Sequence, residues 1–128
     1  MIHLPRAPLV KKGEKIKVGL DMDGTITDFP DFFAALSKSD QFEIHVITGR
    51  GPEHEAVTIQ ELEKCGVRFD KLHLVDATWD MKGKICKDLG IQIMFDDMDE
   101  FIKHISPDTM VFKVRNDGNW NETHSDWI

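Results

Sequence analysis

The sequence is poor in the features of secreted and membrane-spanning proteins. It has only two cysteines, Cys65 and Cys86, and they do not form a CxxC pair. No apolar run is long enough to cross a bilayer, and the first residues lack the apolar core of a signal peptide. We therefore expect a cytoplasmic protein, kept in a reducing setting, without a membrane partner.

Positive charge is also scarce. The chain carries 23 acidic and 16 basic side chains, for a formal net charge of −7, which argues against a general nucleic-acid binder. Lysines do gather at positions 11, 12, 15 and 17, but such a cluster is more often a solvated edge. A length of 128 residues predicts one domain over 1–128, with no room for a second.

Short apolar runs alternate with segments of helical character. Strands are predicted over Ile16–Asp21, Phe42–Thr48, Lys71–Val75, Ile91–Asp96 and Thr109–Val114. Helices are predicted over Asp31–Lys38, Pro52–Cys65, Met81–Leu89 and Asp99–Ile105. This order predicts an α/β fold with a mostly parallel five-stranded sheet and helices on both faces. Residues 1–14 are expected to form an N-terminal extension, and residues 115–128 an irregular tail.

Two aspartates stand where the first predicted strand ends. Asp21 and Asp23 are one residue apart and are followed at once by Gly24. Alternate side chains of an extended segment point to the same side, and a glycine lets the backbone turn sharply behind them. Because paired carboxylates repel each other, this pattern predicts a divalent-metal site at the carboxyl end of a buried strand.

A calcium loop and an acidic surface turn are the competing interpretations. An EF-hand needs glycine at its sixth position and glutamate at its twelfth, whereas Gly24 is fourth here and Phe32 is twelfth. A surface turn is disfavoured because Ile16, Val18 and Leu20 give the preceding run the character of a buried strand.

Other predicted strand ends carry polar groups suited to phosphate chemistry. The second strand ends in Thr48-Gly49, where a hydroxyl and turn amides can bind an anion, although Thr48 could equally be the N-cap of the next helix. The fourth ends in Asp96-Asp97, a second acidic pair that requires a cation if it meets the first. Lys82, at the start of a helix, is placed to neutralise phosphate, with Lys84 as its rival.

With these motifs in this order, the chain over Ile16–Val114 resembles the haloacid dehalogenase superfamily of aspartate-nucleophile phosphohydrolases. The resemblance implies a Rossmann-like three-layer sandwich with strand order 3-2-1-4-5, a Mg²⁺ requirement and phosphoryl transfer through an aspartyl-phosphate. It implies that Asp21 is the nucleophile and that Asp23 serves as acid and base. It also implies that Asp21 and the Asp23 carbonyl bind the metal, while Thr48 and Lys82 bind phosphate.

Two departures from the family pattern leave points open. The family usually has a second acid four residues after the metal-binding aspartate. Four residues after Asp97 the chain has Phe101, whereas four residues after Asp96 it has Glu100. The metal ligand is therefore Asp96 or Asp97, with Asp97 favoured. The segments between motifs are also too short for a cap domain, so an open site is expected. A bulky phosphorylated substrate, a second subunit or local loops would then cover it.

Specificity is expected from the segment after Asp23, from the turn of Thr48–Arg50 or from the tail. Arg50 is a candidate for contact with a polar or anionic substrate group, and Trp120 and Trp127 for stacking on a base. The activity predicted is that of a phosphomonoester hydrolase acting on a small molecule or on an exposed phosphate of a larger one. A nucleotidase, a non-catalytic phosphate-binding domain and a receiver domain are the alternatives; a receiver would carry its phosphorylated aspartate after the third strand.

Overall fold

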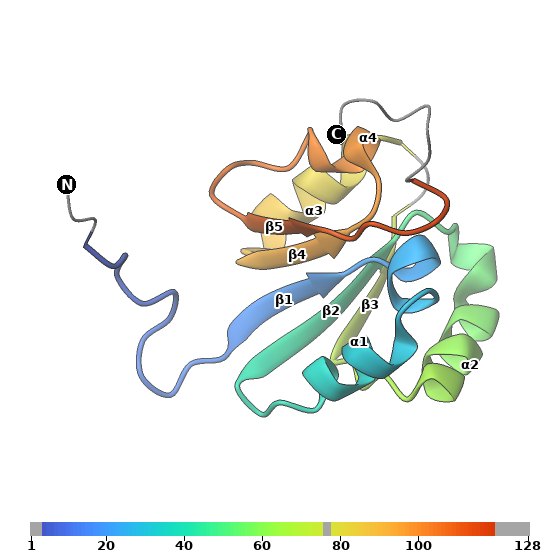
Figure 1. Ribbon diagram of the computed structural model, residues 1–128, viewed down its shortest axis with the longest axis horizontal. Coiled ribbons are helices and arrows are strands. Elements are labelled where there is room, and N and C mark those ends of the chain that lie inside the picture. Colours follow the sequence, from blue (N-terminus) through green and yellow to red (C-terminus); the bar gives the residue numbers. More distant parts are fainter. Residues whose placement is uncertain (1–3, 76–77, 120–128) are drawn as a thin grey trace.

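The protein is built around one five-stranded sheet, described by a computed structural model over residues 4–75 and 78–119. The strands lie in the order β3-β2-β1-β4-β5, and every neighbouring pair is parallel (Figure 1). Their bounds are β1 Ile16–Leu20, β2 Phe42–Thr48, β3 Lys71–Leu74, β4 Ile93–Asp96 and β5 Met110–Lys113. The predicted α/β, Rossmann-like fold and its strand order are confirmed, and the sheet is parallel throughout.

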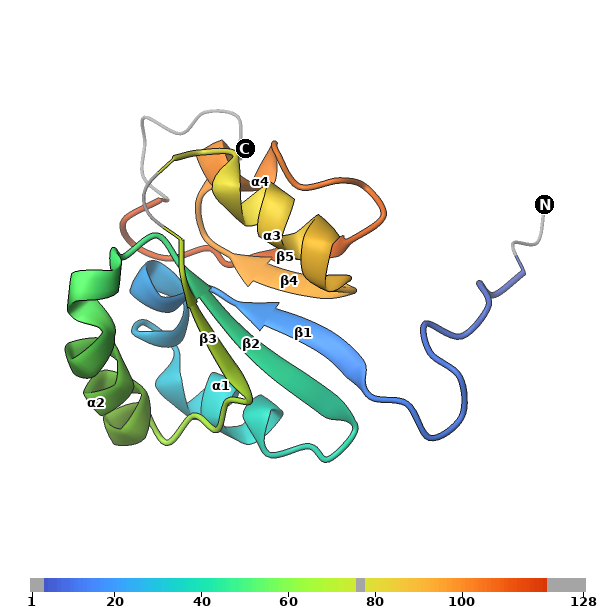
Figure 2. The same cartoon turned by 180° about the vertical axis from the view of Figure 1, so that it is seen from behind.

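Helices lie on both faces of this sheet. Its helices are α1 (Pro30–Ser37), α2 (Glu55–Cys65), α3 (Met81–Leu89) and α4 (Asp99–Ile102). Seen from the front and from behind, α1 and α2 lie on one side of the sheet, and α3 lies on the other (Figures 1 and 2). In the described part of the chain no cap domain covers the strand ends. No helix there combines the length and the apolar character needed to span a bilayer.

The side-chain alternation of the strands produces two cores. Val18, Leu20, Ile44 and Val46 pack with Phe33 of α1 and Leu62 of α2. On the opposite face, Ile47 and Met94 pack with Cys86 of α3 and with Ile91 and Ile105. Both faces of the central strands are covered, although Lys17 in β1 and Glu43 and His45 in β2 interrupt their apolar sequences.

Several predicted boundaries differ from the observed ones by one to three residues, and local hydrogen bonds account for three of the differences. Ile91 donates its N–H to the Cys86 carbonyl, at 2.8 Å, and so closes α3 instead of beginning β4. Thr109 likewise donates to Ser106, so β5 begins at Met110. Beyond Lys103 the N–H groups bond three residues back, as in Ile105 to Ile102 at 3.0 Å, and α4 ends early.

Candidate functional site

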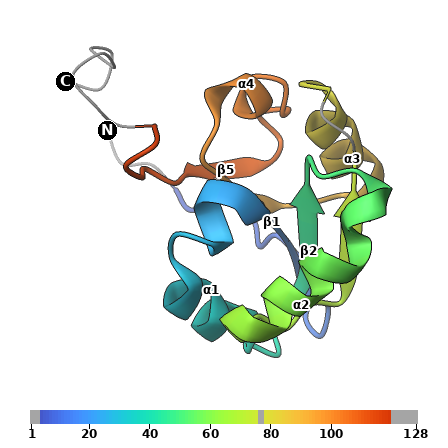
Figure 3. The same ribbon diagram turned by 90° about the vertical axis from the view of Figure 1, so that its right-hand side faces the viewer.

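The carboxyl ends of the strands face the viewer in Figure 3. This edge carries Asp21 after β1, Thr48 at the end of β2, and Asp96-Asp97 at the end of β4. Parallel strands place their ligands at this edge, where the helix N-termini also lie. The fold therefore brings together groups that are more than 70 residues apart in sequence.

Lys82 lies at the centre of the candidate site. Its side chain is fully buried, and its ammonium donates to Asp21 Oδ1 at 2.6 Å and to Asp96 Oδ2 at 2.7 Å. The same Nζ lies 4.1 Å from the centroid of the Phe101 ring, a cation–π contact. Lys84, the rival candidate, is exposed and pairs with Asp80 at 3.1 Å. Of the two lysines, only Lys82 reaches the strand-end carboxylates.

Burial dominates the electrostatics of this cluster. It raises the pKa of Asp21 well above the usual range, against the opposing effect of Lys82 and with a further contribution from Asp96. Burial also raises the pKa of Asp96, again against Lys82. For Lys82, burial lowers the pKa, but Asp21 and Asp96 together outweigh it and the net shift is upward. One buried ammonium is thus shared by two carboxylates, which leaves the cluster short of positive charge.

A third carboxylate completes the cluster. The cluster then has the oxygen donors of a cation site. One oxygen from each of Asp21, Asp96 and Asp97 lies within 4.8 Å of the others. Asp96 uses both oxygens, because Oδ2 accepts from Lys82 and Oδ1 accepts from the Met98 N–H at 3.0 Å. Asp97 Oδ1, in contrast, is buried and has no hydrogen-bond partner among the residues that the structure describes. An orphaned buried carboxylate oxygen beside two more carboxylates fits a hard divalent cation such as Mg²⁺.

Gly24 allows the loop after β1 to pass directly over Asp97. Its φ of +82° lies in the left-handed region, which favours glycine. A Cβ at this position would overlap Asp97 Oδ2 and approach Asn116 Nδ2 to 3.0 Å. The glycine of the motif is therefore required for both conformation and space.

The carboxylate of Asp23 is turned away from this cluster and toward Arg50. Arg50 binds it with two hydrogen bonds, from Nε to Oδ2 at 3.0 Å and from Nη2 to Oδ1 at 2.7 Å. Two side chains of α2 hold Arg50 in turn, Thr58 at 3.0 Å and Glu61 at 2.8 Å. Hydrogen bonding to Arg50 lowers the pKa of Asp23, although the Asp23 side chain is 65% exposed. Sequence reasoning identified Arg50 but not this pairing.

Thr48 is not the N-cap of the following helix. The helical turn η2 (Pro52–His54) begins after Gly51 and has no side-chain cap. Thr48 is buried, and its hydroxyl accepts a hydrogen bond from the Arg50 N–H at 3.3 Å. Thr48 and Gly49 thus form the turn that carries Arg50, beside the end of β1.

A turn at 116–119 supplies groups that sequence reasoning missed. Asn116 donates from Nδ2 to the Gly24 carbonyl at 2.7 Å and to Asp97 Oδ2 at 3.1 Å. Asn119 donates from Nδ2 to the carbonyls of Asp97, at 2.7 Å, and Val114, at 2.8 Å. The composition Asn-Asp-Gly-Asn indicates a turn, but nothing local links it to Asp97.

An acidic cavity adjoins the cluster. Its volume is about 560 Å³, and Asp23, Asp97 and Asn116 are part of its wall. Asp28, Asp99 and Glu100 add further carboxylates, with Lys113 as the basic residue. Glu100 is exposed and is not part of the three-carboxylate cluster. The two tryptophans considered for base stacking, Trp120 and Trp127, lie outside the described residues.

Comparisons with known proteins support the fold alone. No family model matches the chain, and no curated protein matches it. One similar solved structure is a chain of the "Pnkp1/Rnl/Hen1 complex", with a TM-score of 0.61 and 15% identity over 81% of this chain and 47% of that one. The present chain thus spans about half the length of that neighbour. Another is a universal stress protein in complex with cAMP, with a TM-score of 0.55 and 10% identity over 80% and 100% of the two chains.

Proposed function

We propose that the protein is a Mg²⁺-dependent phosphomonoester hydrolase that works through an aspartyl-phosphate on Asp21. The observation that carries the proposal is the Asp21 carboxylate held 2.6 Å from Lys82 at a strand end. Beside it lies Asp97 Oδ1, which has no hydrogen-bond partner within the described part of the chain. This arrangement agrees with the resemblance of the motifs to the haloacid dehalogenase superfamily, in its capless form.

Asp21 is the nucleophile in this mechanism. One of its oxygens forms a bond to phosphorus while the bond from phosphorus to the leaving oxygen breaks. Burial disfavours the ionised carboxylate that this step needs, and Lys82 opposes that effect. Thr25 also donates to Asp21 Oδ2 at 3.0 Å, so the carboxylate is held in one orientation. Thr48 and Gly49, on the neighbouring strand end, are placed to bind a phosphate oxygen.

Asp23 moves the proton. It protonates the leaving oxygen in the first step, and in the second it takes a proton from the water that attacks the phosphorus of the aspartyl-phosphate. The two hydrogen bonds from Arg50 favour the ionised form of Asp23. The carboxylate in this position suits the base step, whereas the acid step requires its release from Arg50.

Asp21, Asp97 and the Asp23 backbone carbonyl would hold the cation. Bound Mg²⁺ would offset the charge of the nucleophile and of the phosphate, so that the two anions can approach each other. Asp96 keeps Lys82 charged and in place through Oδ2, and its Oδ1 accepts from the Met98 N–H.

The substrate class that fits is a phosphomonoester on a small molecule, or an exposed phosphate on a larger one. The carboxylates of the adjoining cavity, among them Asp28, Asp99 and Glu100, disfavour a polyanionic partner such as nucleic acid. A nucleotidase remains a narrower version of the same proposal. A phosphate-binding domain without turnover is the alternative of another class.

A panel of phosphomonoesters, assayed with Mg²⁺ and with a chelator, tests the activity. We expect Mg²⁺-dependent release of phosphate from the wild-type protein and none from Asp21→Asn. We also expect a beryllofluoride adduct on Asp21, detected by fluorine NMR. Asp31→Asn, a matched change at an exposed position of α1, should retain activity. Wild-type turnover in Asp21→Asn would falsify the assignment of Asp21 as the nucleophile. Phosphate binding without turnover by the wild-type protein would favour the alternative of a non-catalytic phosphate-binding domain.

A further inference from the structure

The side-chain amide of Asn116 joins the two halves of the proposed metal site. Its Nδ2 bonds the Gly24 carbonyl, which lies 92 positions away in the sequence, and Asp97 Oδ2, which lies 19 positions away. Gly24 belongs to the loop after β1, and Asp97 follows β4. Asn116 is itself buried. Through one NH₂ group, the turn at 116–119 therefore ties together the loops that carry the candidate ligands.

The orientation of this amide is fixed by its surroundings. Both groups that face Nδ2 are oxygen acceptors, so a rotated amide would place Oδ1 against two oxygens. On the other side, Oδ1 accepts from the Asn119 N–H at 2.9 Å. The Asn116 N–H in turn donates to Asn119 Oδ1 at 2.8 Å. The turn thus holds the Asn116 NH₂ group in the direction of Asp97.

This bonding makes the two Asp97 oxygens unequal. Oδ2 accepts a hydrogen bond from Asn116 and lies against the Gly24 loop, while Oδ1 is buried and has no partner in residues 4–75 and 78–119. Partners of this kind, one step removed from the ion, orient a ligand, and their removal typically weakens metal affinity by roughly 10- to 100-fold.

We infer that Asn116 is a positioning residue that turns Asp97 so that Oδ1 alone is presented to the cation, and that holds the Gly24 loop over it. The inference rests on the proposed function, since it needs a cation at this site. Asn119 supports the same turn, but it bonds the Asp97 backbone carbonyl and not the carboxylate.

The test measures Mg²⁺ binding without substrate, by titration followed through amide NMR shifts, together with thermal unfolding of the metal-free protein. We expect Asn116→Ala to raise the Mg²⁺ dissociation constant by about 10-fold or more. Asn119→Ala is the matched control, because it removes the turn's bonds to the Asp97 and Val114 carbonyls and the acceptor of the Asn116 N–H, but keeps the Asn116 side-chain amide. Asn119→Ala should lower the unfolding temperature at least as much as Asn116→Ala does, but it should weaken Mg²⁺ binding less.

Equal loss of affinity in the two variants, or unchanged affinity in Asn116→Ala, would overturn the inference. Should Asn116→Ala fail to fold, Asn116→Ser gives the same comparison, since its shorter side chain cannot reach both acceptors. Wild-type protein that binds no Mg²⁺ would instead refute the proposed function, and the inference with it. A wild-type protein that binds Mg²⁺ and hydrolyses phosphomonoesters, beside an Asn116→Ala variant of unchanged affinity, refutes the inference alone.

Discussion

The acids Asp96 and Asp97 are adjacent in the chain but differ in their bonding. Asp96 is surrounded by donors, Lys82 on one oxygen and the Met98 N–H on the other. Asp97 has one oxygen bonded to Asn116 and, among the residues described, no partner for the other. A cation gains most from the carboxylate that no other donor has already neutralised. The bonding therefore favours Asp97 over Asp96 as the direct ligand.

Substitution by asparagine separates these roles. Asp97→Asn should weaken Mg²⁺ binding more than Asp96→Asn, because it removes the charge of a direct ligand. Asp96→Asn should lower the unfolding temperature more, because it leaves Lys82 buried with a single carboxylate partner. Mg²⁺ titration and thermal denaturation of both variants check the two expectations. If Asp96→Asn binds Mg²⁺ more weakly, the ligand is Asp96 and the assignment is reversed.

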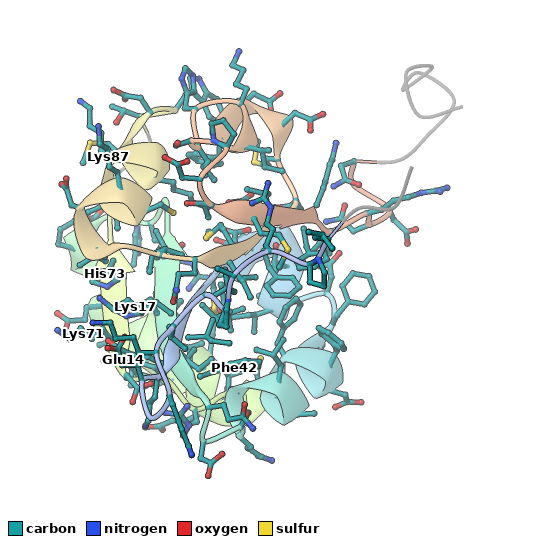
Figure 4. The ribbon with its side chains drawn as sticks, turned by 90° about the vertical axis from the view of Figure 1, so that its left-hand side faces the viewer. Glu14, Lys17, Phe42, Lys71, His73 and Lys87 are labelled. Carbon is teal, nitrogen blue, oxygen red and sulfur yellow. The ribbon has the colours of Figure 1, made fainter. Side chains whose placement is uncertain are left out.

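Among the elements, β2 and β3 carry a second polar cluster that the proposed mechanism does not use. His45 Nδ1 lies 3.0 Å from His73 Nε2, and the two rings are stacked with an interplanar angle of 11°. The other nitrogen of His45, Nε2, is 2.9 Å from Glu43 Oε1. His73 and Lys71, both labelled in Figure 4, belong to β3, and His73 lies in register with Ile47, one residue before the carboxyl end of β2. Burial, and then the charges of His45 and Lys71, lower the pKa of His73.

This shift predicts a pH dependence of stability. Between the lowered pKa of His73 in the folded state and about 6.5 in the unfolded state, the unfolded chain binds more protons. The contribution of a neutral His73 is therefore complete above about pH 6.5 and is lost as the pH falls below it. Urea unfolding from pH 7.5 to 5.5 should show a smaller loss of stability in His73→Gln than in the wild type.

The exposed His104 offers a control for this experiment, because His104→Gln changes the same residue type outside the cluster. It should keep the wild-type pH dependence. If the stability of the wild type and of His73→Gln changes identically with pH, His73 contributes nothing to the pH dependence.

At the scale of the whole molecule, the open strand edge makes Arg50 a central residue. It joins the loop after β1, the turn after β2 and helix α2 through Asp23 and the α2 residues Thr58 and Glu61. Because the described residues form no cap, the guanidinium of Arg50 at this edge is well placed to contact the substrate. Its planar fork can exchange a carboxylate for a phosphate oxygen with the same geometry.

Arg50→Ala should lower kcat/KM by roughly 10- to 100-fold, since a hydrogen bond to a charged group contributes about 1.5–3 kcal/mol. The pKa of Asp23 should rise, because Arg50 is the main cause of its lowering. Steady-state kinetics over a range of pH would register both effects. Arg68→Ala is a suitable control, because Arg68 bonds the Ser37 and Phe42 carbonyls and Asp70, away from the carboxyl ends of the strands. Unchanged kinetics in Arg50→Ala would leave Arg50 a structural residue.

The order of elements and the edge that carries the candidate site could be predicted from the sequence. Apolar runs such as 42–48 and glycine stops such as Gly66 and Gly90 are local signals, and the structure places β2, α2 and α3 accordingly. The positions of Asp21, Thr48 and Asp96 at strand ends follow from the same local pattern, because parallel strands align their carboxyl ends.

Only the tertiary structure decided which of these groups bond to one another. The choice of Lys82 over Lys84 depends on which face of α3 packs against the sheet. The pairing of Asp23 with Arg50 and the bond from Asn116 to Gly24 join positions 27 and 92 apart in sequence. Such contacts depend on side-chain directions that are set when the helices and loops pack on the sheet. Composition and the spacing of motifs do not specify those directions, because they describe the chain one segment at a time.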